Sequence, residues 1–219
     1  MSLQEAIGSI DFFSSLGESD ITQLVSFSTL HSYSKNYIIN YEKRETDKLL
    51  FLVKGVAKAY KIDKHSNEIF LYYIYNNSML CEISDINAVT LHTFSNIETI
   101  EESVVLSIDY PKFQKYFLHN NLLCLEFANE VIKHSRELRT LISREFLFDA
   151  VAKVSMMILS DLEMFNKLKR HETSLILHIQ PATLSRVLTR LKRNKIIDII
   201  QGKILILDEM ALEAIFEDS

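Results

Sequence analysis

The stretch from His178 to Asp208 restricts the fold of this chain more than any other part of its sequence. In HIQPATLSRVLTRLKRNKII, apolar residues recur three and four positions apart, and polar or basic residues fill the other sides of the implied helix. Pro181 suits the first turn of that helix, because its missing N–H needs no partner there. A shorter helical segment at about 172–177 precedes it, and IIDIIQGKILILD follows as two short strands around Gln201–Gly202. A helix, a tight turn, a basic helix and a hairpin together predict a winged helix-turn-helix.

The same region carries a local excess of positive charge. The whole chain has a net charge of −5 at pH 7. Between Asn166 and Lys203, nine Lys and Arg residues stand against only Glu172 and Asp198, a balance of +7 that leaves −12 for the rest of the chain. A basic module on an acidic body is typical of a domain that binds a polyanion, and a solvated helix face is the alternative.

Individual residues of the basic helix suit different contacts with DNA. Arg186 lies on the side away from the apolar residues and is the candidate for a bidentate hydrogen bond to guanine in the major groove. The other expected contacts are Gln180, Pro181, Ala182, Thr183, Ser185, Thr189, Arg190, Arg193 and Lys203. Phosphate contacts, which position a protein on DNA without reading its sequence, suit Thr183, Thr189, Arg190, Lys192, Arg193 and Lys203. An ordinary amphipathic surface helix is the alternative.

Composition places the chain among globular proteins. Its 219 residues allow one large domain or two small ones, and 47% hydrophobic with 24% charged residues can form a core. No apolar run approaches about 18 residues, and the start MSLQEAIGSIDFF lacks the basic and apolar regions of a signal peptide, so we expect a cytoplasmic protein. Two cysteines are too few for a disulfide framework, a four-cysteine zinc site or a cysteine-ligated iron–sulfur cluster, and we expect no metal site.

Residues 26–108 have the texture of short strands. LLFLVKGVAKAYKI places apolar residues on both sides of Gly55 and predicts a hairpin with Gly55 in its turn, where a positive φ has no steric cost. IFLYYIY and VVLSI are further β-rich runs. Several short strands within about 80 residues predict a small antiparallel roll or barrel.

A helical segment with a heptad pattern follows. Its residues are spaced four and three apart at Asn120, Cys124, Phe127, Val131, His134, Leu138 and Leu141. A lone helix with such a stripe must bury it, and a partner subunit is the simplest cover. We therefore expect a homodimer interface formed by Cys124, Phe127, Val131, His134, Leu138 and Leu141, and packing onto the chain's own β domain is the alternative. We expect His134 to be buried at or near this interface rather than to act as a ligand.

Beyond these patterns, the string PATLSRVLTRLKRNKII resembles the recognition helix of the Crp/Fnr family of bacterial transcription regulators. The resemblance covers nearly the whole chain: FFSSLGESDITQL is similar to the N-terminal helices of the family, LLFLVKGVAKAYKI to its roll hairpin, MLCEISDI to its pocket segment and SVVLSIDYPKF to its last roll strand. It implies an α+β fold with an N-terminal double-stranded β-roll of the cyclic-nucleotide-binding type as the effector domain in residues 1–118. A long dimerisation helix in 119–146 and a winged helix-turn-helix DNA-binding domain in 147–219 would follow.

The chain differs from the cyclic-nucleotide binders of this family in the residues that would bind the phosphate. Those members place a glutamate on the ribose and an arginine on the phosphate. Glu82 keeps the glutamate, with Cys81 in place of its glycine, but His92 or Thr93 stands near the position of the arginine. A buried cyclic phosphate would lack its charged partner, so we expect no cyclic AMP site and leave the effector of a pocket at Cys81, Glu82, His92 and Thr93 unidentified.

Two further departures concern the cofactor and the DNA target. Residues 1–80 contain no cysteine, which excludes the iron–sulfur sensor of the family, whereas haem stays open because no spacing singles out one histidine. His178 stands at the turn position usually held by glycine, where we expect a positive φ. Pro181-Ala182 replaces an Arg-Glu pair of the best-known members, so the target sequence should differ from theirs.

The predicted function is a homodimeric, sequence-specific DNA-binding regulator of transcription with RNA polymerase as a further candidate partner. Its two recognition helices would enter successive major grooves of a pseudo-palindrome, about 34–36 Å apart. The alternative is a β-roll ligand-binding module that regulates a protein partner. The sequence contains no glycine-rich phosphate loop, HExxH or nucleophile elbow, so we expect no enzymatic activity.

Overall fold

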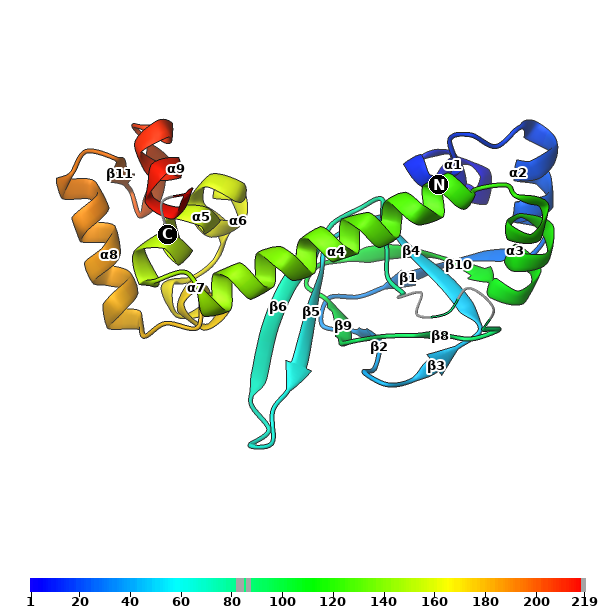
Figure 1. Cartoon of the computed structure of the whole chain (residues 1–219), viewed down its shortest axis with the longest axis horizontal. Helices are drawn as coiled ribbons and strands as arrows, with labels where there is room; N and C mark the ends of the chain where they lie inside the picture. The colour runs from blue at the N-terminus through cyan, green and yellow to red at the C-terminus, as the bar shows by residue number, and fades with distance from the viewer. Residues whose placement is uncertain (82–84, 86–87, 218–219) are drawn as a thin grey trace. The chain divides into compact units, whose positions relative to one another are not determined.

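The computed structural model describes residues 1–81, 85 and 88–217, and its chain divides into two compact units, Met1–Glu137 and Leu138–Ser219 (Figure 1). The long helix α4 (Cys124–Phe146) contributes residues to both units. Within the described ranges, no helix has the length and apolar character needed to cross a membrane.

The first unit is a β-roll built from two four-stranded antiparallel sheets. One sheet has the order β1 (Ser28–Tyr33), β10 (Ser103–Asp109), β4 (Lys48–Lys54), β7 (Ser78–Met79), and the other has β2 (Ile38–Asn40), β9 (Asn96–Thr99), β5 (Ala57–Ile62), β6 (Glu68–Ile74). The strands β3 (Glu45–Thr46) and β8 (Leu91–His92) form a short separate pair. The predicted α+β fold with an N-terminal roll is therefore confirmed.

The expected hairpin around Gly55 is wrong. β4 pairs with β10 and β7, whereas β5 pairs with β6 and β9, so Gly55 carries the chain from one sheet to the other. Apolar runs on both sides of a glycine predict two strands, but they do not decide whether the strands pair with each other. The expected positive φ is present at 104°, and a Cβ at this position would lie 2.4 Å from Ser103 Oγ and 2.8 Å from the Glu102 carbonyl oxygen.

An aromatic cluster joins the roll to the helices around it. These helices are α1 (Leu3–Gly8), the 3-10 turn η1 (Asp11–Phe13), α2 (Glu18–Val25), α3 (Tyr110–Tyr116) and the 3-10 turn η2 (Leu118–Asn120). The ring of Phe12 lies 5.2 Å from Phe51 of β4 and 6.1 Å from Phe127 of α4, between ring centroids. Phe113 of α3 lies 6.3 Å from Phe127. The first turn of α4 is therefore part of the core of the first unit.

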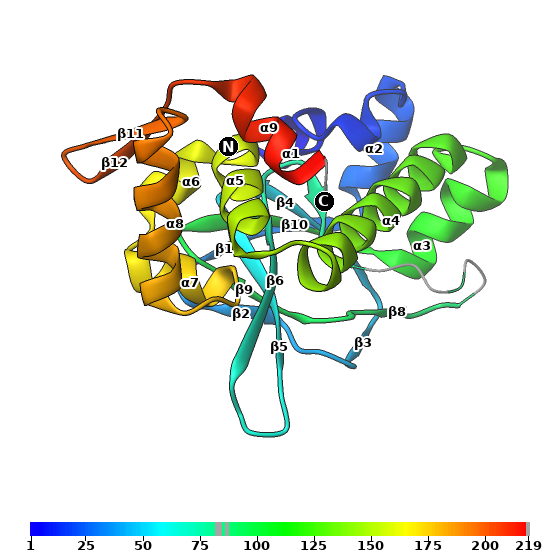
Figure 2. The same cartoon turned by 60° about the vertical axis from the view of Figure 1, so that its left-hand side comes forward.

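The second unit is a winged helix-turn-helix, as predicted. It contains α5 (Ala150–Ser160), α6 (Leu162–Lys167), α7 (Arg170–Ile176), α8 (Pro181–Arg193), β11 (Ile197–Ile200), β12 (Lys203–Ile206) and α9 (Glu209–Glu217). The helical pattern of about 149–165 forms two helices, because Asp161 leaves helical backbone angles and its side chain caps α6 by accepting from the Met164 N–H. Leu184, Val187, Leu188 and Leu191 bury one face of α8 against the unit, while its opposite face is open (Figure 2).

Candidate nucleic-acid interface and β-roll cavity

The exposed face of α8 gathers five of the residues predicted to contact DNA. Ser185, Arg186, Thr189, Arg190 and Arg193 are exposed and together line a shallow surface depression. They follow the same three- and four-residue spacing as the buried leucines, on the other side of the helix. One helix thus presents a packed apolar face and a basic face, which is the arrangement of a recognition helix.

The start of α8 is accessible as well. Gln180, Pro181 and Ala182 are exposed and Thr183 is half-buried. Gln180 is the N-cap residue of α8, and its side chain accepts no hydrogen bond from the N–H groups of the first turn. Pro181 has no N–H and the Thr183 N–H donates to the Gln180 carbonyl oxygen, so the Ala182 N–H is the group in this turn that is available to an external acceptor such as a phosphate oxygen.

Arg186 folds back along its own helix. Its Nε donates to the Ala182 carbonyl oxygen at 3.3 Å and its Nη2 to Thr183 Oγ1 at 3.4 Å. Both hydrogen bonds are long, so the side chain can leave them for a stronger acceptor. Within the described part of the chain, Arg186, Arg190 and Arg193 form no ion pair with a carboxylate, and their charges face outward.

Lys192 differs from its neighbours on the helix. Its Nζ lies 2.8 Å from Asp198 Oδ1 of β11. The hydrogen bond from Lys192 and a second from the Ile199 N–H lower the pKa of Asp198 below its ordinary value. Lys192 therefore joins the recognition helix to the wing, and its charge is partly balanced.

The wing is positioned by a side chain that the sequence reasoning missed. Asn166 of α6 donates to the Ile204 carbonyl oxygen at 3.0 Å and accepts from the Ile204 N–H at 2.7 Å. The hairpin turns at Gln201 and Gly202, with φ values of 50° and 81°, and leaves Lys203 exposed. No local pattern marks Asn166, because its partner lies 38 residues away.

His178 adopts the positive φ expected at the turn between α7 and α8, with a value of 51°. Its ring Nδ1 lies 2.8 Å from Glu145 Oε2 in the last turn of α4. The turn therefore has a side-chain connection to α4 as well as the left-handed backbone.

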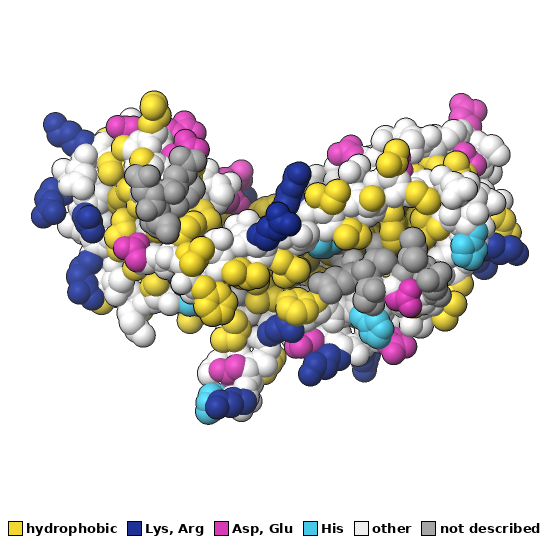
Figure 3. All heavy atoms as spheres, in the orientation of Figure 1, with side chains coloured by type: hydrophobic (Ala, Val, Ile, Leu, Met, Phe, Trp, Pro, Cys, Tyr) yellow, Lys and Arg dark blue, Asp and Glu magenta, His cyan; other side chains and the backbone are white. Residues whose placement is uncertain are grey.

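The heptad stripe of α4 does not form one continuous face. Phe127 is 4% exposed in the aromatic core, and His134 lines a cavity in its own unit, so these two expected interface residues are covered by their own chain. Leu141 is half-buried, while Cys124, Val131 and Leu138 are exposed. The apolar residues exposed on α4 are Leu125, Val131, Ile132, Leu138, Ile142 and Phe146. The exposed apolar residues therefore share Val131 and Leu138 with the predicted stripe, while Leu125 and Ile142 lie one residue beyond its Cys124 and Leu141. Hydrophobic side chains gather on the surface along α4 (Figure 3).

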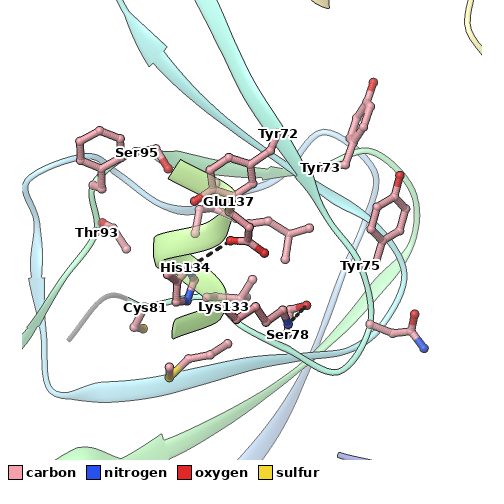
Figure 4. A pocket seen from close by; sticks show the side chains of 16 residues that line it. Tyr72, Tyr73, Tyr75, Ser78, Cys81, Thr93, Ser95, Lys133, His134 and Glu137 are labelled. Carbon is pink, nitrogen blue, oxygen red and sulfur yellow. Dashed lines mark hydrogen bonds and ion pairs between the residues drawn. The ribbon is translucent and has the colours of Figure 1, made fainter. Parts of the chain in front are cut away.

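A cavity of about 310 Å³ opens in the β-roll beside α4 (Figure 4). Its walls come from β6 and the residues after it, from β7, from the 93–97 segment and from α4. Of the expected pocket residues, Cys81 and Thr93 line the cavity, whereas His92 does not: it lies in β8, where it pairs with Glu45. Glu82 lies outside the described residues. Sequence reasoning missed the tyrosines Tyr72, Tyr73 and Tyr75 and the α4 residues Lys133 and Glu137.

The charged groups of the cavity pair with each other. His134 Nδ1 lies 3.2 Å from Glu137 Oε2, and Lys133 Nζ lies 3.2 Å from Ser78 Oγ and 4.0 Å from Glu130 Oε2 (Figure 4). Among the described lining residues there is no arginine. A cyclic phosphate does not fit this donor set, because no arginine is among the described lining residues and the one lysine already contacts the Glu130 carboxylate and the Ser78 hydroxyl. Within the described ranges, no group of three or more His, Cys, Asp or Glu residues could hold a metal ion.

The geometry defines a class: a winged helix-turn-helix DNA-binding protein with a β-roll domain. Residues 157–215 match the Crp-like helix-turn-helix domain. This matched range covers α8 and the wing, so it includes the candidate interface. No curated protein matches the sequence.

Solved structures match nearly the whole fold. A CooA mutant from Carboxydothermus hydrogenoformans has a TM-score of 0.72 at 17% identity, covering 95% of each chain. FixK2 from Bradyrhizobium japonicum has a TM-score of 0.66 at 16% identity, covering 86% of this chain and 96% of its own. The c-di-GMP-responsive global regulator CLP of Xanthomonas campestris has a TM-score of 0.60 at 14% identity, covering 87% of this chain and 99% of its own. At these identities the whole-chain matches show the fold alone.

Together, the domain match and the exposed basic face of α8 show a Crp-like helix-turn-helix DNA-binding domain, as in a transcription regulator, and the solved structures show the fold of the whole chain.

Proposed function

We propose that the protein is a cytoplasmic homodimer that binds a pseudo-palindromic operator through α8 and responds to a small-molecule effector in its β-roll cavity. The observation that carries the proposal is the exposed basic face of α8, whose three arginines have no carboxylate partner within the described residues. Arginine charges held outward on a helix of this size suit the major groove, which admits one α-helix.

Arg186 reads a base in this proposal. Its guanidinium can exchange two long hydrogen bonds within α8 for a bidentate pair to guanine O6 and N7. Arg190, Arg193 and Lys203 bind phosphates, and the Ala182 N–H in the first turn of α8 binds another. Ser185 and Thr189 face the same side of the helix and contact the DNA between these positions.

A second copy of the chain covers the exposed face of α4. Leu125 is 78% exposed and Phe146 82% exposed, and Ile132 and Ile142 lie between them on the same side of the helix. Seven-residue steps join Leu125 to Ile132 and Val131 to Leu138, which is the period of a coiled coil. Of the residues first assigned to the interface, Cys124, Val131 and Leu138 remain in it.

The β-roll cavity holds the effector. Its volume of about 310 Å³ is at the lower end of small-molecule sites, and its wall contains three residues of α4: Lys133, His134 and Glu137. A ligand here touches the same helix that forms the dimer, which gives it a route to change the arrangement of the two DNA-binding domains. RNA polymerase is the further partner expected of such a regulator.

The test is selection of an operator from random DNA, followed by titration of the purified protein at several salt concentrations. The proposal predicts a selected sequence with two-fold symmetry, tighter binding to it than to random DNA, and a steep loss of affinity as salt rises. Equal affinity for selected and random DNA, or affinity independent of salt, would contradict it. The second result would favour the protein-partner alternative.

A further inference from the structure

A partly buried ion-pair cluster surrounds Glu145 in the last turn of α4. Its Oε1 accepts from Arg144 Nε at 2.9 Å, and its Oε2 lies 2.8 Å from His178 Nδ1 and 3.4 Å from Lys153 Nζ. The side chains of Arg144 and Lys153 are only 10% and 9% exposed. The Glu145 and His178 side chains are 24% and 27% exposed, so one half-buried carboxylate holds three cationic or hydrogen-bonding groups, and such contacts are stronger there than at the open surface.

The three partners belong to three different parts of the second unit. Arg144 is on α4, Lys153 is on α5, and His178 is in the turn that leads into α8. The turn is short, because the N-cap Gln180 follows His178 by two residues. A fixed imidazole at this position therefore fixes the start of α8 relative to the last turn of α4.

The backbone of His178 supports a specific role for its side chain. Its φ of 51° is in the left-handed region, which favours glycine over residues with a Cβ. The chain keeps a histidine there, and the imidazole reaches Glu145 across 33 residues of sequence. The contact offsets the conformational cost of that backbone.

We propose that Glu145 and His178 are positioning residues that set the orientation of the recognition helix for DNA. Neither residue touches DNA in this account; each acts through the placement of α8. The inference rests on the proposed function, because it needs a specific operator. It goes beyond that function by naming what holds α8 to the helix of the dimer interface.

The experiment compares Glu145→Gln with Glu163→Gln in the full-length protein. Each substitution removes one negative charge from the second unit, and Glu163 is a matched control because its carboxylate forms an exposed pair with Lys167 at 2.7 Å. Charge alone predicts equal or slightly tighter DNA binding for both variants. Our inference predicts that Glu145→Gln binds the selected operator about tenfold more weakly, as expected for the loss of one charge-assisted hydrogen bond, while Glu163→Gln does not.

A second variant separates positioning from folding. His178→Gly removes the imidazole, suits the positive φ and leaves Glu145 with Arg144 and Lys153, so it tests the contact even if Glu145→Gln fails to fold. We expect it to weaken operator binding about as much as Glu145→Gln, with circular dichroism showing a folded protein. The double variant should lose no more than Glu145→Gln alone, since that substitution already removes the charged contact with His178.

The outcomes separate the two proposals. A wild-type protein that does not prefer its selected operator contradicts the proposed function. A specific wild-type protein whose Glu145→Gln and Glu163→Gln variants bind the operator alike contradicts the positioning role, and so do additive losses in the double variant.

Discussion

The recognition helix and the β-roll cavity are built from sequence in two different ways. The exposed face of α8 comes from one continuous segment, residues 181–193. The cavity is assembled from β6, β7, the 93–97 segment and α4, which are brought together by strand pairing and packing. The period of a helix assigns faces from local sequence, whereas no local pattern says which strand lies beside which. The exposed residues of α8 can therefore be predicted from local sequence, whereas the cavity residues can be predicted only in part.

The largest expected effect concerns the residue that the heptad pattern placed on the wrong side of α4. Phe127→Ala should lower the free energy of unfolding by about 3–5 kcal/mol, because its ring packs against Phe12 and Phe113. Urea denaturation measures this loss. Asn129→Ala, an exposed position two residues along α4, is the control and should change stability by less than about 0.5 kcal/mol. Equal stability of the two variants would contradict the burial of Phe127 in the core of the first unit.

A comparison of α8 with α4 shows how far the sequence determines the fold. The three- and four-residue spacing predicts one buried face of α8, and the structure buries all four of its residues, Leu184, Val187, Leu188 and Leu191. In α4 the stripe was ambiguous, because its first turns pack against the chain's own core while Leu125 and Phe146 stay exposed. A period of three and four residues predicts that a face is buried, but it does not name what covers it.

The next effect tests the exposed apolar residues of α4. Replacing Leu138 and Ile142 with Asp places two charges in the proposed dimer interface, which should weaken dimerisation at least about 100-fold. Analytical ultracentrifugation across a concentration series measures the dissociation constant. Asn129→Asp adds a charge on another exposed side of α4 and should leave the constant unchanged. A double variant that still sediments as a stable dimer would remove α4 from the interface.

The pH dependence of stability tests the Glu145 cluster. Burial alone would raise the pKa of Glu145, but hydrogen bonds from His178 and Arg144 and the charges of both lower it below its ordinary value. Its contribution to stability is therefore complete above about pH 4.3 and is lost as the pH falls through the lower pKa of the folded state. We expect Glu145→Gln to be less stable than wild type by about 1–3 kcal/mol at pH 7, with the difference vanishing in acid below that range. Thermal unfolding at a series of pH values measures it, and a difference that grows on acidification has the wrong sign.

The smallest expected effect is the absence of a response to cyclic AMP. Lys133 is already paired with Glu130 and Ser78, and the described lining residues offer no arginine for a phosphate. Calorimetry with cyclic AMP should therefore show no saturable heat at micromolar concentrations. Binding at micromolar concentrations would contradict this prediction and would show that the cavity binds a phosphate without an arginine.

The pocket prediction shows where sequence reasoning ended. Thr93 and Cys81, two of the predicted pocket residues, line the cavity, whereas His92 pairs with Glu45 in the short strand β8 and is not among the lining residues. Lys133 and Glu137 were missed, since they come from a helix about 40 residues further along the chain than Thr93. The heptad pattern predicts His134 in the homodimer interface, whereas in the structure it lines the cavity.

The central claim, that α8 reads DNA sequence, is tested most directly by Arg186→Ala. A bidentate contact to guanine discriminates by about 1–3 kcal/mol, and a symmetric dimer makes it twice, so the variant should lose about 2–6 kcal/mol of affinity for the selected operator and much less for random DNA. Arg193→Ala is the matched control, because a phosphate contact should weaken both DNAs alike and reduce the salt dependence. Fluorescence anisotropy of both variants with both DNAs gives, for each variant, the ratio of its affinity for the operator to its affinity for random DNA. An Arg186→Ala protein that loses the same factor on operator and random DNA would contradict a base-reading role for this helix.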